Sequence, residues 1–250
     1  MTRRKIAGVL VAGGLVLGSP VLGGCAWSSV PMDAAAGYVT LTQDTFASAV
    51  ATAASAKPAV REVITVDSGT STYEFDRTTS VTKWRLAGAL GSSTNGTPIT
   101  GELMVIGDDL YLRASGMTPP GKWVKTTAAA AGLASAGTVG IDPSTLGEGL
   151  LRGMVSFKAL GRTTIEGDDV QHYEVTVNTA AIVGQSKTNL GSGETVPESF
   201  YLNDDNTPRR IVITMPGGVG NTQIDFTHWG QGGTIEPPAP ADVIIPKPQK

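Results

Sequence analysis

The sequence predicts a mostly β protein of the α+β class, in which about ten antiparallel strands form one long twisted sheet and short helices cover its apolar face. Apolar and polar residues alternate with a period of two in most segments between residues 61 and 229, and 32 of the 250 residues are Gly, which suits frequent turns. A few other stretches have the small, apolar composition of short helices. They are the natural cover for the apolar face of the sheet.

The N-terminus has the organisation of a bacterial secretion signal. Three basic residues at 3–5 precede twelve uncharged residues at 6–17, a run that rises about 18 Å as a helix and is short of the roughly 30 Å membrane core. Cys25, the only cysteine, follows an apolar residue and two small ones at 22–24 and resembles the lipobox of bacterial lipoproteins. The pattern predicts that residues 1–24 are removed, that Cys25 is acylated, and that the exported protein is anchored to the outer face of the cytoplasmic membrane. The alternative is an ordinary signal peptide with an incidental cysteine.

A flexible tether and a first helix are expected next. Residues 25–42 are rich in Ser, Ala, Gly and Pro, a composition typical of a tether. Small helix formers follow at 43–54, with Phe46 and Val50 spaced at i and i+4. Pro58 ends this helix.

The alternating segments define the strands of the sheet. The expected strands are 61–67, 71–76, 82–86, 101–106, 110–113 and 123–125, and then 155–160, 163–166, 172–178, 199–202, 209–214 and 223–229.

Two short helices are expected in the middle of the chain. They span 127–136 and 142–151, and their apolar residues are Leu133, Leu146, Leu150 and Leu151. A third short helical stretch is expected near 179–185.

The predicted domain boundaries follow from these elements. Residues 43–236 form one folded domain, and residues 237–250 form a Pro-rich tail that is expected to be extended and mobile.

Several motifs resemble the actinobacterial lipoproteins with a LolA-like half-barrel. They are Gly-Asp-Asp-Leu-Tyr-Leu at 107–112, Gly-Asp-Asp-Val-Gln-His-Tyr-Glu-Val-Thr-Val at 167–177, Tyr-Leu-Asn-Asp-Asp-Asn-Thr-Pro-Arg-Arg-Ile-Val-Ile at 201–213 and Asp-Phe-Thr-His-Trp-Gly at 225–230. The resemblance covers most of residues 43–236. It implies a strongly curved half-barrel sheet with short helices on its concave face.

The same resemblance implies that an acylated lipid or glycolipid is bound between the sheet and the helices, with envelope transport proteins as further partners. The residues expected to border the lipid are the apolar side chains of the helices: Phe46, Val50, Leu133, Leu146, Leu150 and Leu151. Small Ala and Gly residues on these helices would leave room for a ligand, or they would permit close packing of a filled core.

Catalytic, metal and nucleic-acid functions are not expected. The sequence contains no G-x-S-x-G, H-E-x-x-H or G-x-x-x-x-G-K-S/T motif. His172 and His228 lie in alternating strands and are interpreted as structural, with His228 on the same face as Phe226. The net charge of −3 and pI of 5.4 argue against binding to phosphate backbones.

Paired acids could suggest calcium, but they are interpreted as turn residues, and no cofactor is predicted. These pairs are Asp108-Asp109, Asp168-Asp169 and Asp204-Asp205.

Two functions therefore remain open at the level of sequence. One is a membrane-anchored carrier that binds lipid in an apolar cavity, and the other is a non-enzymatic envelope adaptor that acts through protein contacts. A large apolar cavity favours the carrier, and a filled interior with an exposed apolar patch favours the adaptor.

Overall fold

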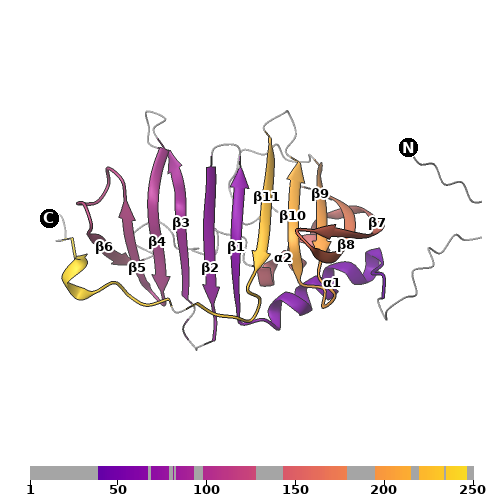
Figure 1. The fold of residues 1–250 in the computed structure, drawn as a ribbon, viewed down its shortest axis with the longest axis horizontal. Helices are drawn as coiled ribbons and strands as arrows, with labels where there is room; N and C mark the ends of the chain where they lie inside the picture. Colours follow the sequence, from indigo (N-terminus) through magenta and orange to yellow (C-terminus); the bar gives the residue numbers. More distant parts are fainter. Residues whose placement is uncertain are drawn as a thin grey trace, which may run out of the picture. The chain divides into compact units, whose positions relative to one another are not determined.

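Twelve strands form a single curved sheet in the computed structural model (Figure 1). The structure describes residues 39–66, 69–78, 81, 83–92, 98–127, 143–178, 195–214, 220–233 and 235–246. The strand order is β12-β6-β5-β4-β3-β2-β1-β11-β10-β9-β8-β7. Two antiparallel meanders, one from each half of the chain, are therefore joined side by side where β1 pairs with β11. The predicted fold class, a mostly β protein with one curved antiparallel sheet and short helices, is confirmed.

The strand boundaries agree broadly with the alternating segments. The first meander consists of β1 (Ala59–Val66), β2 (Gly69–Asp76), β3 (Lys83–Ser92), β4 (Pro98–Ile106), β5 (Asp109–Ala114) and β6 (Trp123–Thr127). The second consists of β7 (Met154–Ile165), β8 (Asp168–Asn178), β9 (Thr195–Leu202), β10 (Pro208–Thr214) and β11 (Asn221–Thr227).

One long strand replaces two predicted ones in the second meander. The segments 155–160 and 163–166 are continuous in β7, which pairs with β8 along its whole length. Gly161, at φ 93°, lies in a register shift of this pairing, so the glycine bends the strand without ending it.

Strand pairing places apolar side chains from distant segments on one face of the sheet, which we call the inner face. Val60 of β1 is level with Phe75, and Phe75 with Trp84, on the next two strands. On the other side of β1, Ile64 is level with Ile224, which is level with Ile211. Because alternate residues of a strand point to opposite faces, these rows place apolar side chains of many strands on the same face of the sheet.

Two helices lie against one half of the inner face. They are α1 (Gln43–Ser55) and α2 (Pro143–Gly153). Thr42 caps α1, and its backbone N–H donates to Thr45 Oγ1 at 2.9 Å. The predicted helices near 127–136 and 179–185 lie outside the described residues. Within the described residues, no helix is both long and apolar enough to cross a membrane.

The two helices cross at very short range because α2 carries a glycine at the contact. A Cβ atom added to Gly147 would lie 2.2 Å from Ala51 Cβ and 2.9 Å from the Ala47 carbonyl oxygen. The small residues of the helices therefore serve close helix-to-helix packing at this point.

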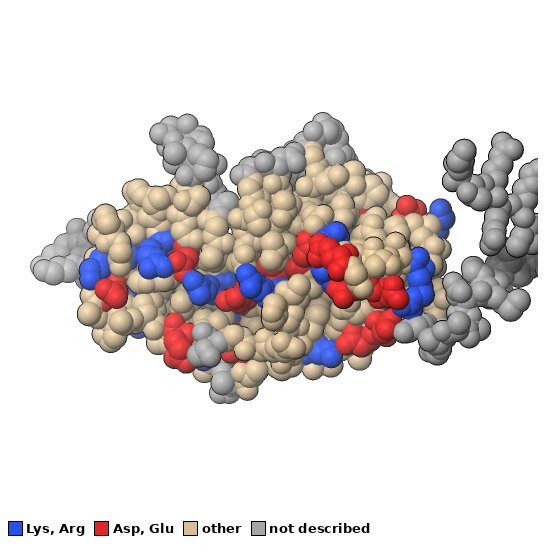
Figure 2. All heavy atoms as spheres, viewed as in Figure 1, with Lys and Arg blue, Asp and Glu red and all other residues tan. Residues whose placement is uncertain are grey.

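The opposite, outer face of the sheet carries a band of charged side chains that crosses the strands (Figure 2). Arg61 pairs with Glu74 on β2, and Arg85 and Arg113 both pair with Glu102 on β4. From β1 to β5 these ion pairs therefore lie on the face opposite the apolar rows.

Part of the predicted mobile tail belongs to the sheet. Residues Val243–Ile244 form β12, which pairs in parallel with β6, and Lys122 Nζ lies 3.1 Å from Asp242 Oδ1. Val243 packs against a small cluster on the outer face, which consists of Met104, Tyr111, Trp123 and Ile235. The expectation of a mobile tail is therefore wrong for this stretch, because apolar contacts and strand pairing offset its proline content.

Candidate lipid-binding site

The predicted ligand residues on the helices form part of a tightly filled core. Phe46 and Val50 are fully buried, Leu150 is nearly so, and Leu146 packs against the same cluster. The ring of Phe46 lies 5.2 Å from the rings of Phe157 and Tyr173 and 5.3 Å from that of Phe200, measured between centroids. The side chains of the protein itself thus fill the space between α1 and this half of the sheet.

The two other predicted residues differ from this group. Leu151 is 63% exposed, so the expectation that it faces the sheet is wrong. Leu150 already occupies the buried side of α2, and neighbouring residues of a helix point about 100° apart. Leu133 lies outside the described residues, as does the predicted lipidation site, Cys25.

The other half of the inner face is apolar along four consecutive strands, β2 to β5. Its side chains form a second cluster, to which each strand contributes at least one large apolar residue, and Ile64 and Phe75 pack against both clusters. The members are Tyr73, Trp84, Leu86, Leu103, Val105 and Leu110, with Ile64, Phe75, Leu90 and Leu112 packed against them. We call this surface the β2–β5 face.

A buried acid borders the β2–β5 face. Glu62 lies level with Tyr73 on one side and with Phe226 on the other, and both of its carboxylate oxygens are shielded from solvent. Burial, together with the charge of Glu62, raises the pKa of Tyr73.

A second buried acid lies in the helix-covered half. Glu198 is level with Val175 on β8 and with Ile213 on β10, and its exposed fraction is 8%. Desolvation by this burial raises the pKa of Glu198 to about 7.

Sequence reasoning missed both acids, although a signal exists for them. Glu198 has the same parity in β9 as the buried Phe200 and Leu202, and Glu62 has the same parity in β1 as Val60. The strand period alone thus places both carboxyl groups on the inner face.

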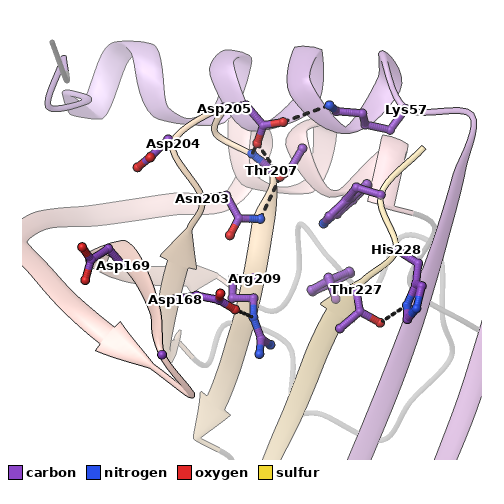
Figure 3. Close-up of a pocket in the computed structure, with 13 residues that line it drawn as sticks. Lys57, Asp168, Asp169, Asn203, Asp204, Asp205, Thr207, Arg209, Thr227 and His228 are labelled. Atoms are coloured by element: carbon purple, nitrogen blue, oxygen red, sulfur yellow. Dashed lines mark hydrogen bonds and ion pairs between the residues drawn. The ribbon is translucent and has the colours of Figure 1, made fainter. Parts of the chain in front are cut away.

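A charged cleft of about 720 Å³ lies where several chain segments meet, and it differs from the apolar interior (Figure 3). Its residues come from the turn before β8, the β9–β10 turn, the end of β11 and the stretch after α1. They are Lys57, Gly167, Asp168, Asp169, Asn203, Asp204, Asp205, Thr207, Arg209, Phe226, Thr227, His228 and Trp229.

Ion pairs and hydrogen bonds connect the walls of this cleft. Lys57 Nζ lies 2.9 Å from Asp205 Oδ2, and Arg209 Nε donates to Asp168 Oδ2 at 3.0 Å. Burial opposes ionisation of Asp205, but hydrogen bonds from Thr207 and the charge of Lys57 outweigh it and lower the pKa. These contacts tie the ends of the strands together, and the cleft offers little apolar surface to an acyl chain.

The acid pairs lie at turns, as predicted. Asp108 lies in the β4–β5 turn, Asp204 and Asp205 lie in the β9–β10 turn, and the pair Asp168-Asp169 begins β8 directly after a turn. In the part of the chain that the structure describes, no group of three or more His, Cys, Asp or Glu side chains is arranged to hold a metal ion.

The two histidines have different environments. His172 stacks on Tyr201 with 4.3 Å between ring centroids, and burial lowers its pKa. His228 is exposed beyond the end of β11, at φ 57°, and its Nδ1 lies 2.9 Å from Thr227 Oγ1. The expectation that His228 shares a strand face with Phe226 is wrong, because the chain turns at this residue.

Comparisons with known proteins identify the fold. No protein-family model matches the sequence, and no curated protein does. LprF from Mycobacterium bovis is 17% identical, with a TM-score of 0.61 over 81% of this chain and 100% of that chain. The lipoprotein LppX from Mycobacterium tuberculosis is 13% identical, with a TM-score of 0.53 over 78% of this chain and 100% of that chain. The chain therefore has the LolA-like fold of these mycobacterial lipoproteins.

Proposed function

We propose that this chain is an exported lipoprotein that binds an acylated lipid or glycolipid and carries or presents it in the cell envelope, with the acyl chains against the β2–β5 face. The single observation that carries this proposal is the uninterrupted apolar composition of that face over four strands. Each Å² of apolar surface removed from water contributes about 25 cal/mol, so burial across several strands contributes substantial binding free energy for an acyl chain. The fold shared with LprF and LppX also supports the proposal.

The location differs from the one expected from sequence for a physical reason. Between α1 and β7–β9, aromatic rings are already in contact, so a ligand there would have to displace Phe46 or its neighbours. On the β2–β5 face, by contrast, some apolar side chains, such as Leu112, are only half-buried, so a ligand can contact them.

The proposed activity is binding, with no chemical step. The buried acids Glu62 and Glu198 lie among apolar residues. In the cleft, Lys57 pairs with Asp205 and Arg209 pairs with Asp168. Such an interior suits retention of a lipid rather than acid–base chemistry on it.

Lipid occupancy tests the proposal directly. The protein is produced in an actinobacterial host, and native mass spectrometry with lipid extraction measures what copurifies. Leu112→Trp adds volume to the β2–β5 face and should lower lipid occupancy with little change in thermal stability. The matched control, Leu160→Trp, enlarges an exposed residue of β7 and should leave occupancy unchanged.

The opposite result would favour the adaptor. If the wild type carries no lipid and Leu112→Trp costs about 1–3 kcal/mol of stability, the interior is filled and lipid carriage is excluded.

The anchor is tested separately at Cys25. Cys25→Ala should release the protein from the membrane fraction or leave an unprocessed precursor, because the acylated residue is gone. Intact-mass analysis of the wild type should show a mature chain that begins at an acylated Cys25. A wild-type chain without lipid at this residue would overturn the anchor while leaving lipid binding by the domain open to its own test.

A further inference from the structure

Exposed aliphatic side chains gather at the β7 end of the sheet. Leu151 at the end of α2 is 63% exposed, and Val155 at the start of β7 is 53% exposed. No residue separates α2 from β7, and Leu151 and Val155 are only four positions apart in the sequence, so the two side chains are close together. Leu160, further along β7, and Val39, before α1, are also exposed.

The described chain begins at this same end. The backbone N–H of Leu41 donates to the hydroxyl of Tyr173 at 3.3 Å, and Tyr173 is level with Ala159 on β7. Phe46 in the first turn of α1 contacts Phe157 on β7. The chain that connects to the proposed anchor at Cys25 therefore enters the domain beside β7, where Figure 1 shows the start of α1.

The β7 edge is poorly suited to pairing with a strand of another protein. Its pairing with β8 shifts register between Met154 and Ser156 and again between Ala159 and Gly161. Lys158 and Arg162 also lie on this strand. Bulges and charges of this kind are the features by which proteins protect edge strands from strand addition.

A lipid surface is a more suitable partner for the exposed residues at the β7 end than a strand of another protein. Arg152 and Lys158 are exposed and flank the aliphatic side chains, which gives the apolar residues with basic neighbours that bind anionic bilayers. The ion pair of Lys158 with Glu174 is 3.9 Å long and exposed, so it is weak enough for the ammonium to exchange to a lipid phosphate.

We infer that the β7 end of the domain rests on the membrane, with Leu151 and Val155 inserted into the lipid interface and Arg152 and Lys158 at the headgroups. This inference rests on the proposed anchor at Cys25. It defines an orientation in which β7 faces the bilayer and β12, at the other edge of the sheet, points away from it.

A fluorescent probe at single positions tests this orientation in the full chain. The acylated lipoprotein is reconstituted into vesicles of phosphatidylethanolamine and phosphatidylglycerol. Because acylated Cys25 has no free thiol, Leu151→Cys places one environment-sensitive label at the β7 end. Met117→Cys is the matched control, since Met117 is 60% exposed in the β5–β6 connection.

The expected result is a blue shift and protection from an aqueous quencher at position 151, with neither change at position 117. Equal behaviour at the two positions, whether shifted or unshifted, would overturn the inference. A shift at 151 that grows with protein concentration at a fixed amount of lipid would show contact between copies and would also overturn it. Failure of the anchor itself is distinguishable, because a free thiol at Cys25 would take up a second label detectable by mass.

Discussion

The two halves of the sheet have the same strand pattern, but in the described part of the chain their inner faces pack against different partners. In the half formed by β7 to β11, α1 and α2 supply side chains such as Phe46 and Leu150 to a core with the strands. In the half formed by β2 to β5, the large side chains of the strands form a cluster of their own.

Alternation in a strand therefore predicts a buried face, but it does not predict which part of the chain, or which ligand, covers that face. An amphipathic strand needs an apolar neighbour, and a helix of the same chain and an acyl chain of a ligand both meet that need. The helix-covered half is a core in the usual sense, and the β2–β5 face is the half that we assign to lipid.

The largest expected effect comes from emptying the helix-covered half. Phe46→Ala removes a fully buried ring that contacts three others and should cost about 3–5 kcal/mol of unfolding free energy. Leu112→Ala, at a half-buried position of the β2–β5 face, should cost clearly less. Chemical denaturation measures both, and an equal cost would mean that the two halves are packed alike.

The pH dependence of stability should originate in the helix-covered half, at Glu198. Its pKa is raised from 4.5 to about 7, so the folded protein holds the proton more tightly than the unfolded chain. Stability from this group is complete below pH 4.5 and is lost as the pH rises through about 7.

Glu198→Gln keeps the shape of the side chain and cannot ionise. At pH 9 the variant should therefore be more stable than the wild type by on the order of 3 kcal/mol, and at pH 4 the two should be similar. Thermal melts across pH measure the difference. A constant offset at every pH would show that ionisation of Glu198 is not its cause.

Close packing of the two helices should be sensitive to one methyl group. Gly147→Ala places a Cβ 2.2 Å from Ala51 Cβ and should cost about 1–3 kcal/mol. Gly149→Ala is the matched control, because a Cβ there meets nothing within 4 Å and gains up to about 1 kcal/mol of helix propensity. If Gly147→Ala is as well tolerated as Gly149→Ala by thermal melting, the helices are not in close contact.

The smallest effect is expected at the charged cleft. Lys57→Ala removes a partly exposed ion pair with Asp205 and should cost less than about 1 kcal/mol, because solvent screens the pair. If chemical denaturation shows a loss of unfolding free energy as large as that of Phe46→Ala, the ion pairs of the cleft stabilise the fold as strongly as the apolar interior does.

Much of the fold could be predicted from local patterns. Alternation identified the strands, and the spacing of Phe46 and Val50 indicated α1 and its buried side. Periodicity predicted the inward direction of Leu150 but not the outward direction of Leu151, because a phase error of one residue turns a helical side chain by about 100°.

The candidate site was predicted less well, for two reasons. Apolar helix residues such as Phe46 have the same pattern whether they touch a ligand or a core, so sequence placed the lipid where aromatic rings are in contact. The predicted site residues do not include Glu62 and Glu198, because buried acids are rare, although strand parity points both inward.

The secretion-signal pattern, the strands and the turns can be predicted from sequence, because each depends on residues close together in the chain. The pairing of β1 with β11, the addition of Val243–Ile244 to the sheet and the contact of Gly147 with Ala51 are visible only in the folded structure. These contacts join residues far apart in sequence, and their free energy comes from surfaces that exist only once both partners are folded.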